Sequence, residues 1–115
     1  EMLTGQHIGN ALYGFQGLSS TQQVRDLLSV LAPKIYSSTD TMKPQEIGMA
    51  FYGLKRMHDT KEVHMVIDAL IKKIEAASTL SFQNIGHVLF SLQNLSCSSD
   101  TVKSVLRAVI PKILS

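Results

Sequence analysis

Apolar residues recur at helical spacing in three separate stretches of the chain. In each stretch they fall at i, i+3, i+4, i+7 and i+10, which is one face of an α-helix. The three faces comprise Ile8, Ala11, Leu12, Phe15 and Leu18; Ile47, Ala50, Phe51, Leu54 and Met57; and Ile85, Val88, Leu89, Leu92 and Leu95. A second helical stripe follows each face, and in the first copy it comprises Val24, Leu27, Leu28, Leu31 and Ile35. The pattern predicts pairs of amphipathic helices.

The three stretches are copies of one another. Ile8, Ile47 and Ile85 form one column, spaced 39 and then 38 residues apart, and the copies end on PKI at 33–35, KKI at 72–74 and PKI at 111–113. Because one helical hairpin cannot cover its own apolar face, neighbouring copies must stack. The sequence therefore predicts an all-α fold, an α-solenoid of three stacked helical hairpins with a repeat of about 38–39 residues. We expect one domain over 1–115, with units at about 3–40, 41–78 and 79–115, as a fragment of a longer array.

Polar residues and prolines mark the expected helix ends. The expected N-caps are Thr4, Lys43 and Ser81 for the first helices, and Ser20, Asp59 and Ser98 for the second helices. Lys43 is the poor member, because its side chain offers no acceptor to a backbone N–H. Pro33 and Pro111 lie near the end of a second helix, which they are expected to kink or terminate.

Glycine occupies one column of the first helices, at Gly9, Gly48 and Gly86. A glycine inside a helix costs roughly 1 kcal/mol relative to alanine, so the column needs a reason. We interpret it as the place where an adjacent first helix approaches closely, with the aromatic residue four positions on lying over the gap. The alternative is that the glycines bring a ligand near the backbone. A second pair, Gly14 and Gly53, is harder to assign, because the third copy has Ser91 there.

Composition narrows the functional classes only a little. The 115 residues are 44% apolar with a formal charge of +2, which is ordinary for a soluble globular protein and too weakly basic to indicate nucleic acid. No apolar run approaches the ~18 residues of a membrane helix, and no secretory signal is visible. The single cysteine, Cys97, excludes an internal disulfide and fits a reducing compartment. We expect no membrane partner.

Motifs for catalysis are absent from the sequence. There is no glycine-rich phosphate loop after a strand, and no catalytic constellation. The four histidines show no metal-ligand spacing with one another or with Cys97. We therefore expect no enzymatic activity, no metal or other cofactor, and no small-molecule substrate.

One stripe of the first helices changes its chemistry from copy to copy while the neighbouring stripes keep theirs. Modular recognition requires such variation within a constant frame, and these side chains can present donors and acceptors to base edges. The alternative is that the positions are merely solvated and free to vary. The candidate RNA-binding residues on this stripe are His7, Asn10, Glu46, Met49, Arg56, Asn84, His87 and Asn94.

A lysine closes each copy, at Lys34, Lys73 and Lys112. Regularly spaced lysines can follow a phosphate backbone while other residues read the sequence, so these three are also candidate RNA contacts. At least as good an alternative is that they are cations near helix C-termini, which interact favourably with the helix dipole.

The unit resembles a known family. A helical hairpin of 37 to 39 residues with IGNALYGFQGL or IGMAFYGLKRM in its first helix and VRDLLSVLAPKI in its second is similar to the octotricopeptide and heptatricopeptide repeats. These occur in organellar RNA-binding proteins of algae and protists, many with a separate terminal nuclease-like domain. The resemblance covers essentially the whole chain, but the Pro-Pro-Pro-Glu-Trp signature and the nuclease-like domain are absent, so it implies no nuclease activity.

Two functional hypotheses follow. The resemblance implies binding of single-stranded or structured RNA in a mitochondrion or plastid, as part of organellar RNA metabolism or a ribonucleoprotein. The alternative is a protein–protein interaction scaffold, because the grooves of a solenoid bind peptides and partner helices equally well.

Overall fold

The computed structural model describes residues 2–114, with Leu114 described by its backbone alone. Over these residues the chain forms six α-helices, one short 3₁₀ helix and no strand, which confirms the all-helical prediction. The α-helices are α1 (Gly5–Tyr13), α2 (Gln22–Ser37), α3 (Pro44–Gly53), α4 (Lys61–Ala76), α5 (Phe82–Ser91) and α6 (Asp100–Leu114), and the 3₁₀ helix η1 (Gly14–Gly17) follows α1.

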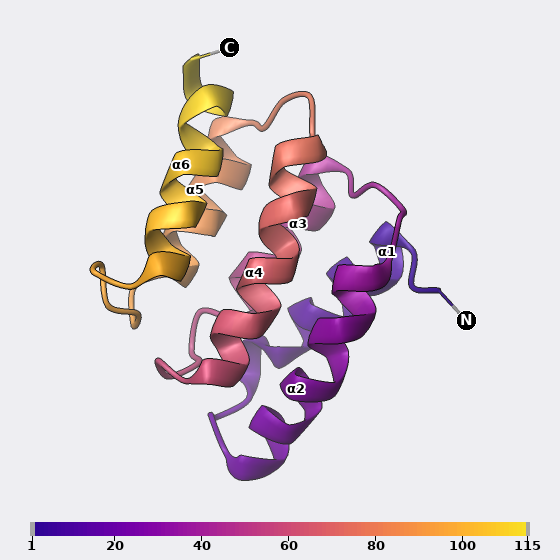
Figure 1. Ribbon diagram of the computed structural model, residues 1–115, viewed down its shortest axis with the longest axis vertical. Coiled ribbons are helices and arrows are strands. Elements are labelled where there is room, and N and C mark those ends of the chain that lie inside the picture. Colours follow the sequence, from indigo (N-terminus) through magenta and orange to yellow (C-terminus); the bar gives the residue numbers. More distant parts are fainter. Residues whose placement is uncertain (1, 115) are drawn as a thin grey trace.

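The α-helices lie in two layers. Helix α3 packs against both α1 and α5, while α4 packs against both α2 and α6. Figure 1 shows α2, α4 and α6 side by side nearer the viewer, with α1, α3 and α5 behind them. We call these the second-helix layer and the first-helix layer. The shortest dimension of the molecule, 23 Å, matches two helix diameters of about 10–12 Å each.

The first helices begin where the sequence predicts. The hydroxyls of Thr4 and Ser81 each accept a backbone N–H three residues on, from His7 and Asn84, at 3.1 Å. Lys43 makes no side-chain cap, as expected, and α3 begins instead with Pro44, whose fixed φ suits a first helical position.

The second helices begin one residue later than predicted. Their N-caps are Thr21, Thr60 and Ser99, whereas Ser20, Asp59 and Ser98 precede them. A cap hydroxyl must reach the N–H three residues on. Those N–H groups belong to Val24, Val63 and Val102, the first apolar residue of each second helix, which places the cap after rather than on the predicted residue.

The ends of the helices also differ from expectation. Pro33 and Pro111 lie inside α2 and α6, which continue to Ser37 and Leu114, so the prediction that they terminate the helix is wrong. Each proline is in the last turn or the turn before it, where few backbone bonds depend on it. The α-helical part of the first copy ends at Tyr13, and Leu18, predicted on the buried face, is exposed beyond η1.

The apolar core fills the space between the two layers. Ile8, Ile47 and Ile85 are all buried, in agreement with the predicted face. Leu12 and Phe51 in the next column are completely buried, but Leu89, their counterpart in the third copy, is 42% exposed. The difference arises because, in the part of the chain that the structure describes, α5 has a first helix on one side only.

The glycine column follows the same logic. A Cβ on Gly9 would lie 3.2 Å from the backbone oxygen of Glu46, and one on Gly48 would lie 3.1 Å from Nδ2 of Asn84. Nothing lies within 4 Å of the corresponding point on Gly86. Close approach of the next helix is thus the right explanation for Gly9 and Gly48 and the wrong one for Gly86.

Candidate nucleic-acid interface

Three aromatic side chains form a continuous row across the first-helix layer. The ring centroids of Tyr13 and Tyr52 are 6.2 Å apart, and those of Tyr52 and Phe90 are also 6.2 Å apart. The ring planes are inclined by only 27° and 24°, so the rings are stacked. We call Tyr13, Tyr52 and Phe90 the aromatic row. Tyr13 and Phe90 are exposed and Tyr52 is half-buried, so the row lies at the surface.

The repeat itself produces this row. Each ring stands at the same position of its first helix, and α1, α3 and α5 pack side by side, so equivalent side chains fall into line. The sequence predicted that these rings cover the glycine column, but their contact with one another appears only once the helices are packed. The row was therefore absent from the candidate residues, although its unvarying aromatic character was visible in the sequence.

A shallow hollow of about 380 Å³ adjoins the row, lined by Tyr13, Met49, Tyr52 and His87. The imidazole of His87 lies 4.9 Å from the Tyr52 ring, centroid to centroid. On the same ring, the ammonium of Lys55 lies 3.8 Å from the centroid, a cation–π contact. The hollow thus combines aromatic faces, an imidazole and a positive charge, which together suit a planar, electron-rich group next to an anion.

The predicted stripe divides into residues that face this hollow and residues that do not. Met49 and His87 line the hollow, and Asn10 is their exposed counterpart in the first copy. Arg56 and Asn94 are exposed farther along the layer. The amide of Asn94 donates a hydrogen bond to the Lys55 carbonyl at 3.1 Å, which ties the third copy to the second.

The other three members of the stripe complete helix N-termini. His7 Nδ1, Glu46 Oε1 and Asn84 Oδ1 each accept the backbone N–H of the N-cap residue three positions earlier, at 3.3, 2.8 and 3.3 Å. An acceptor is the only chemical requirement at this position, and all three side chains supply one. Capping thus gives a structural reason for these residue types that is independent of any ligand.

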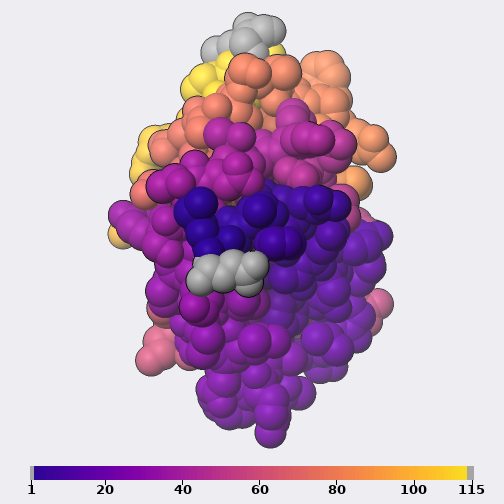
Figure 2. All heavy atoms as spheres, turned by 90° about the vertical axis from the view of Figure 1, so that its right-hand side faces the viewer, coloured from indigo at the N-terminus to yellow at the C-terminus, as the bar shows by residue number. Residues whose placement is uncertain are grey.

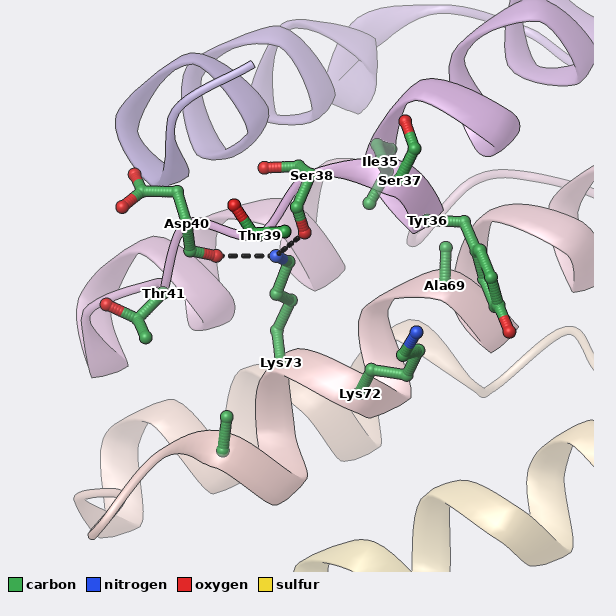
Figure 3. A pocket seen from close by; sticks show the side chains of 11 residues that line it. Ile35, Tyr36, Ser37, Ser38, Thr39, Asp40, Thr41, Ala69, Lys72 and Lys73 are labelled. Atoms are coloured by element: carbon green, nitrogen blue, oxygen red, sulfur yellow. Dashed lines mark hydrogen bonds between the residues drawn. The ribbon is translucent and has the colours of Figure 1, made fainter. Parts of the chain in front are cut away.

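The lysine column contacts backbone carbonyls of the preceding copy. Lys73 is only 6% exposed, and Figure 3 shows its ammonium donating to the carbonyls of Ser38, at 2.8 Å, and Asp40. Ser38 is the C-cap of α2, so the cation lies at the negative end of that helix. Burial lowers the pKa of Lys73 from its ordinary value, and the nearby Asp40 charge opposes the shift.

Lys112 repeats this arrangement one copy later. Its ammonium donates to the carbonyls of Ala77, the C-cap of α4, and Glu75. Lys34, in the first copy, is exposed. Of the two interpretations, the structure therefore favours cations at helix C-termini, although each lysine serves the helix of the preceding copy rather than its own. The three lysines do not form one exposed ridge.

Lys73→Met should lower the free energy of unfolding by about 1–3 kcal/mol, because the buried carbonyls of Ser38 and Asp40 would lose their donor while the aliphatic stem is kept. Lys34→Met is the matched control in the same column, and in dilute solution it should change stability by less than about 0.5 kcal/mol. Urea unfolding followed by circular dichroism measures both. Equal effects of the two substitutions would contradict a structural role specific to Lys73.

The remaining polar contacts connect parts of the fold. Asp59 pairs with His64 and accepts the backbone N–H of Ser96 at 3.1 Å, and both contacts lower the pKa of Asp59. No nucleophile is positioned by this pair. A cavity of about 320 Å³ beside Lys73 is lined mainly by the linker 37–41 and by α4 (Figure 3). Within residues 2–114 no three His, Cys, Asp or Glu side chains are gathered as metal ligands, and no helix has the length and apolarity to cross a membrane.

Comparisons with known proteins add no assignment. The chain matches no family model, no curated protein and no solved structure. The functional argument consequently rests on the geometry of its own residues, above all on the aromatic row.

Proposed function

We propose that the chain is an α-solenoid of three stacked hairpins whose first-helix layer binds single-stranded RNA along the aromatic row. The order of packing, with α3 between α1 and α5 and with α4 between α2 and α6, supports the solenoid. The organellar setting, in RNA metabolism or a ribonucleoprotein, rests on the resemblance to octotricopeptide and heptatricopeptide repeats. The proposed role is binding, without catalysis.

The observation that supports RNA most directly is the exposed, stacked aromatic row. Single-stranded nucleic acids bind proteins largely by stacking of bases on aromatic rings, with cations near the phosphates. The row offers such rings at regular intervals, and Lys55 places an ammonium against the central one. Glu46 is the only acidic residue in α1, α3 and α5, so few negative charges oppose a phosphate backbone on this layer.

Base preference would come from the residues beside the row. Asn10, Met49 and His87 stand at equivalent positions of successive copies and present an amide, a thioether and an imidazole. An amide can bond to a base edge in both directions, a thioether only contacts apolar surface, and an imidazole donates or accepts according to its tautomer. Successive copies would therefore favour different bases.

Tyr52→Ala should weaken RNA binding about 5- to 100-fold, because stacking on an aromatic ring contributes roughly 1–3 kcal/mol per base. Fluorescence anisotropy with labelled single-stranded oligonucleotides of mixed and homopolymeric sequence measures the affinity. Lys55→Met should reduce the slope of log affinity against log salt by about one unit.

Tyr36→Ala is the matched control. Tyr36 is an exposed tyrosine with a lysine ammonium, that of Lys72, 3.9 Å from its ring centroid, but it belongs to the second-helix layer. Its removal should leave affinity unchanged, and Tyr52→Phe should retain binding. Phe90→Ala tests the row at a more exposed position, where folding is less affected. Equal losses at Tyr36 and Tyr52, or no binding of any RNA at about 50 mM salt, would refute the RNA proposal and favour the protein scaffold.

A further inference from the structure

The edge of the molecule formed by α1 and α2 exposes apolar residues whose counterparts in later copies are buried. Leu27 on α2 is 49% exposed, whereas Val66 on α4 and Val105 on α6 are fully buried. Val30 is exposed in the same way, while its counterparts Ala69 and Ala108 are buried. Figure 2 views this edge, where the indigo and purple atoms of the first copy lie toward the viewer. We call it the leading edge.

The opposite edge, formed by α5 and α6, shows the converse pattern. Leu106, Ile110 and Ile113 on α6 are exposed, and Ile110 is 52% exposed. Their counterparts on α4 are Ile67, Ile71 and Ile74, of which the first and last are fully buried and Ile71 packs against the core. On α5, Leu89 is exposed where Phe51 is buried. We call this the trailing edge.

Both edges reproduce surfaces that already pack against each other inside the chain. In the layer formed by α2, α4 and α6, the surface that α4 turns toward α2 corresponds to the leading edge, and the surface that α4 turns toward α6 corresponds to the trailing edge. The same contact occurs twice, between α2 and α4 and between α4 and α6. The structure thus shows what kind of surface covers each edge.

Lys34 adds a polar element to this complementarity. Its counterparts Lys73 and Lys112 donate to carbonyls at the C-terminal end of the preceding second helix. Lys34 occupies the same column on the leading edge. A helix α6 docked there would bring its own C-terminal carbonyls, which lack intrahelical partners, to the Lys34 ammonium.

We propose that the leading edge of one molecule binds the trailing edge of a second copy, head to tail. Such an interface is heterologous, so each copy keeps one edge unoccupied and the assembly grows stepwise into linear oligomers. The proposal is independent of RNA binding and is tested without RNA. The same docking would place Phe90 of one copy next to Tyr13 of the following copy, as Tyr52 is placed next to Tyr13 within the chain.

Sedimentation velocity over a range of micromolar concentrations tests the proposal, with one charge introduced on each edge. Leu27→Glu should block the leading edge and Ile110→Glu the trailing edge, each lowering the association constant at least about 100-fold, because a carboxylate would be buried without a partner. Both sites are exposed in the single chain, so each variant should fold normally. Met65→Glu, at an exposed position on the middle helix α4, should leave association unchanged.

Mixing the two edge variants gives the decisive result. Each variant alone should be a monomer, while an equimolar mixture should form a dimer and nothing larger, because only one pair of intact edges remains. A wild-type chain that stays monomeric at high micromolar concentration would overturn the proposal. So would a mixture that fails to dimerise, or either variant alone forming a dimer, which would indicate a symmetric interface.

Discussion

Gly53→Ala should destabilise the protein by about 3 kcal/mol, at the upper end of what overpacking usually costs, although alanine favours a helix over glycine. A Cβ on Gly53 would lie 1.8 Å from the backbone oxygen of Leu12 and 2.7 Å from Cα of Tyr13. Both atoms belong to the backbone of α1 and cannot move aside as a flexible side chain would. The substitution therefore forces α1 and α3 apart, and thermal unfolding should show a large fall in the midpoint.

Gly14→Ala is the matched control, because Gly14 stands in the same column of the repeat. Nothing lies within 4 Å of its added Cβ, and its φ of −62° and ψ of −19° suit alanine. We expect a gain of about 0.4–1 kcal/mol from the reduced freedom of the unfolded chain. If Gly53→Ala proved as stable as the wild-type protein, the contact between α1 and α3 would have to be looser than the structure has it.

Phe51→Ala should lower the free energy of unfolding by about 3–5 kcal/mol. Phe51 is fully buried on α3, the helix that packs against both α1 and α5, so the cavity would open where the layer has neighbours on both sides. Because a small domain has only about 5–15 kcal/mol of stability, the loss should remove most of the cooperative unfolding transition. Urea unfolding followed by circular dichroism measures it.

Leu89→Ala provides the comparison within the same column. Leu89 is the counterpart of Phe51 on α5 and is 42% exposed, so its truncation removes less buried surface. We expect a loss of about 1 kcal/mol or less, measured in dilute solution, where no second copy covers the trailing edge. Equal effects of the two substitutions would mean that the exposure of α5 is misassigned.

Much of the helical organisation could be predicted from the chain alone. The apolar spacing identified both helices of each copy, and Thr4 and Ser81 were correctly predicted as caps, because these features depend on residues only a few positions apart. The second-helix caps were displaced by one residue, since neighbouring polar residues such as Ser20 and Thr21 compete for the same role. Local sequence does not decide between them.

The candidate site was predicted less well. Met49 and His87 do lie together at the hollow beside the aromatic row. Lys73, in contrast, is buried, with its ammonium hydrogen-bonded to backbone carbonyls of the preceding copy. A lysine spaced 39 residues from its counterparts has the same appearance in the sequence whether it is exposed or buried, since its partners lie more than 30 residues away.

The sequence by itself determined the helices, their pairing and the 39-residue register, because periodicity and capping are properties of short segments. Only the tertiary structure decided which members of a column are buried. Gly53 touches a backbone where Gly14 touches nothing, and Phe51 is buried where Leu89 is exposed. The physical reason is that identical positions acquire different neighbours once the helices pack: the middle copy is covered on both sides, and the outer copies keep one open edge each.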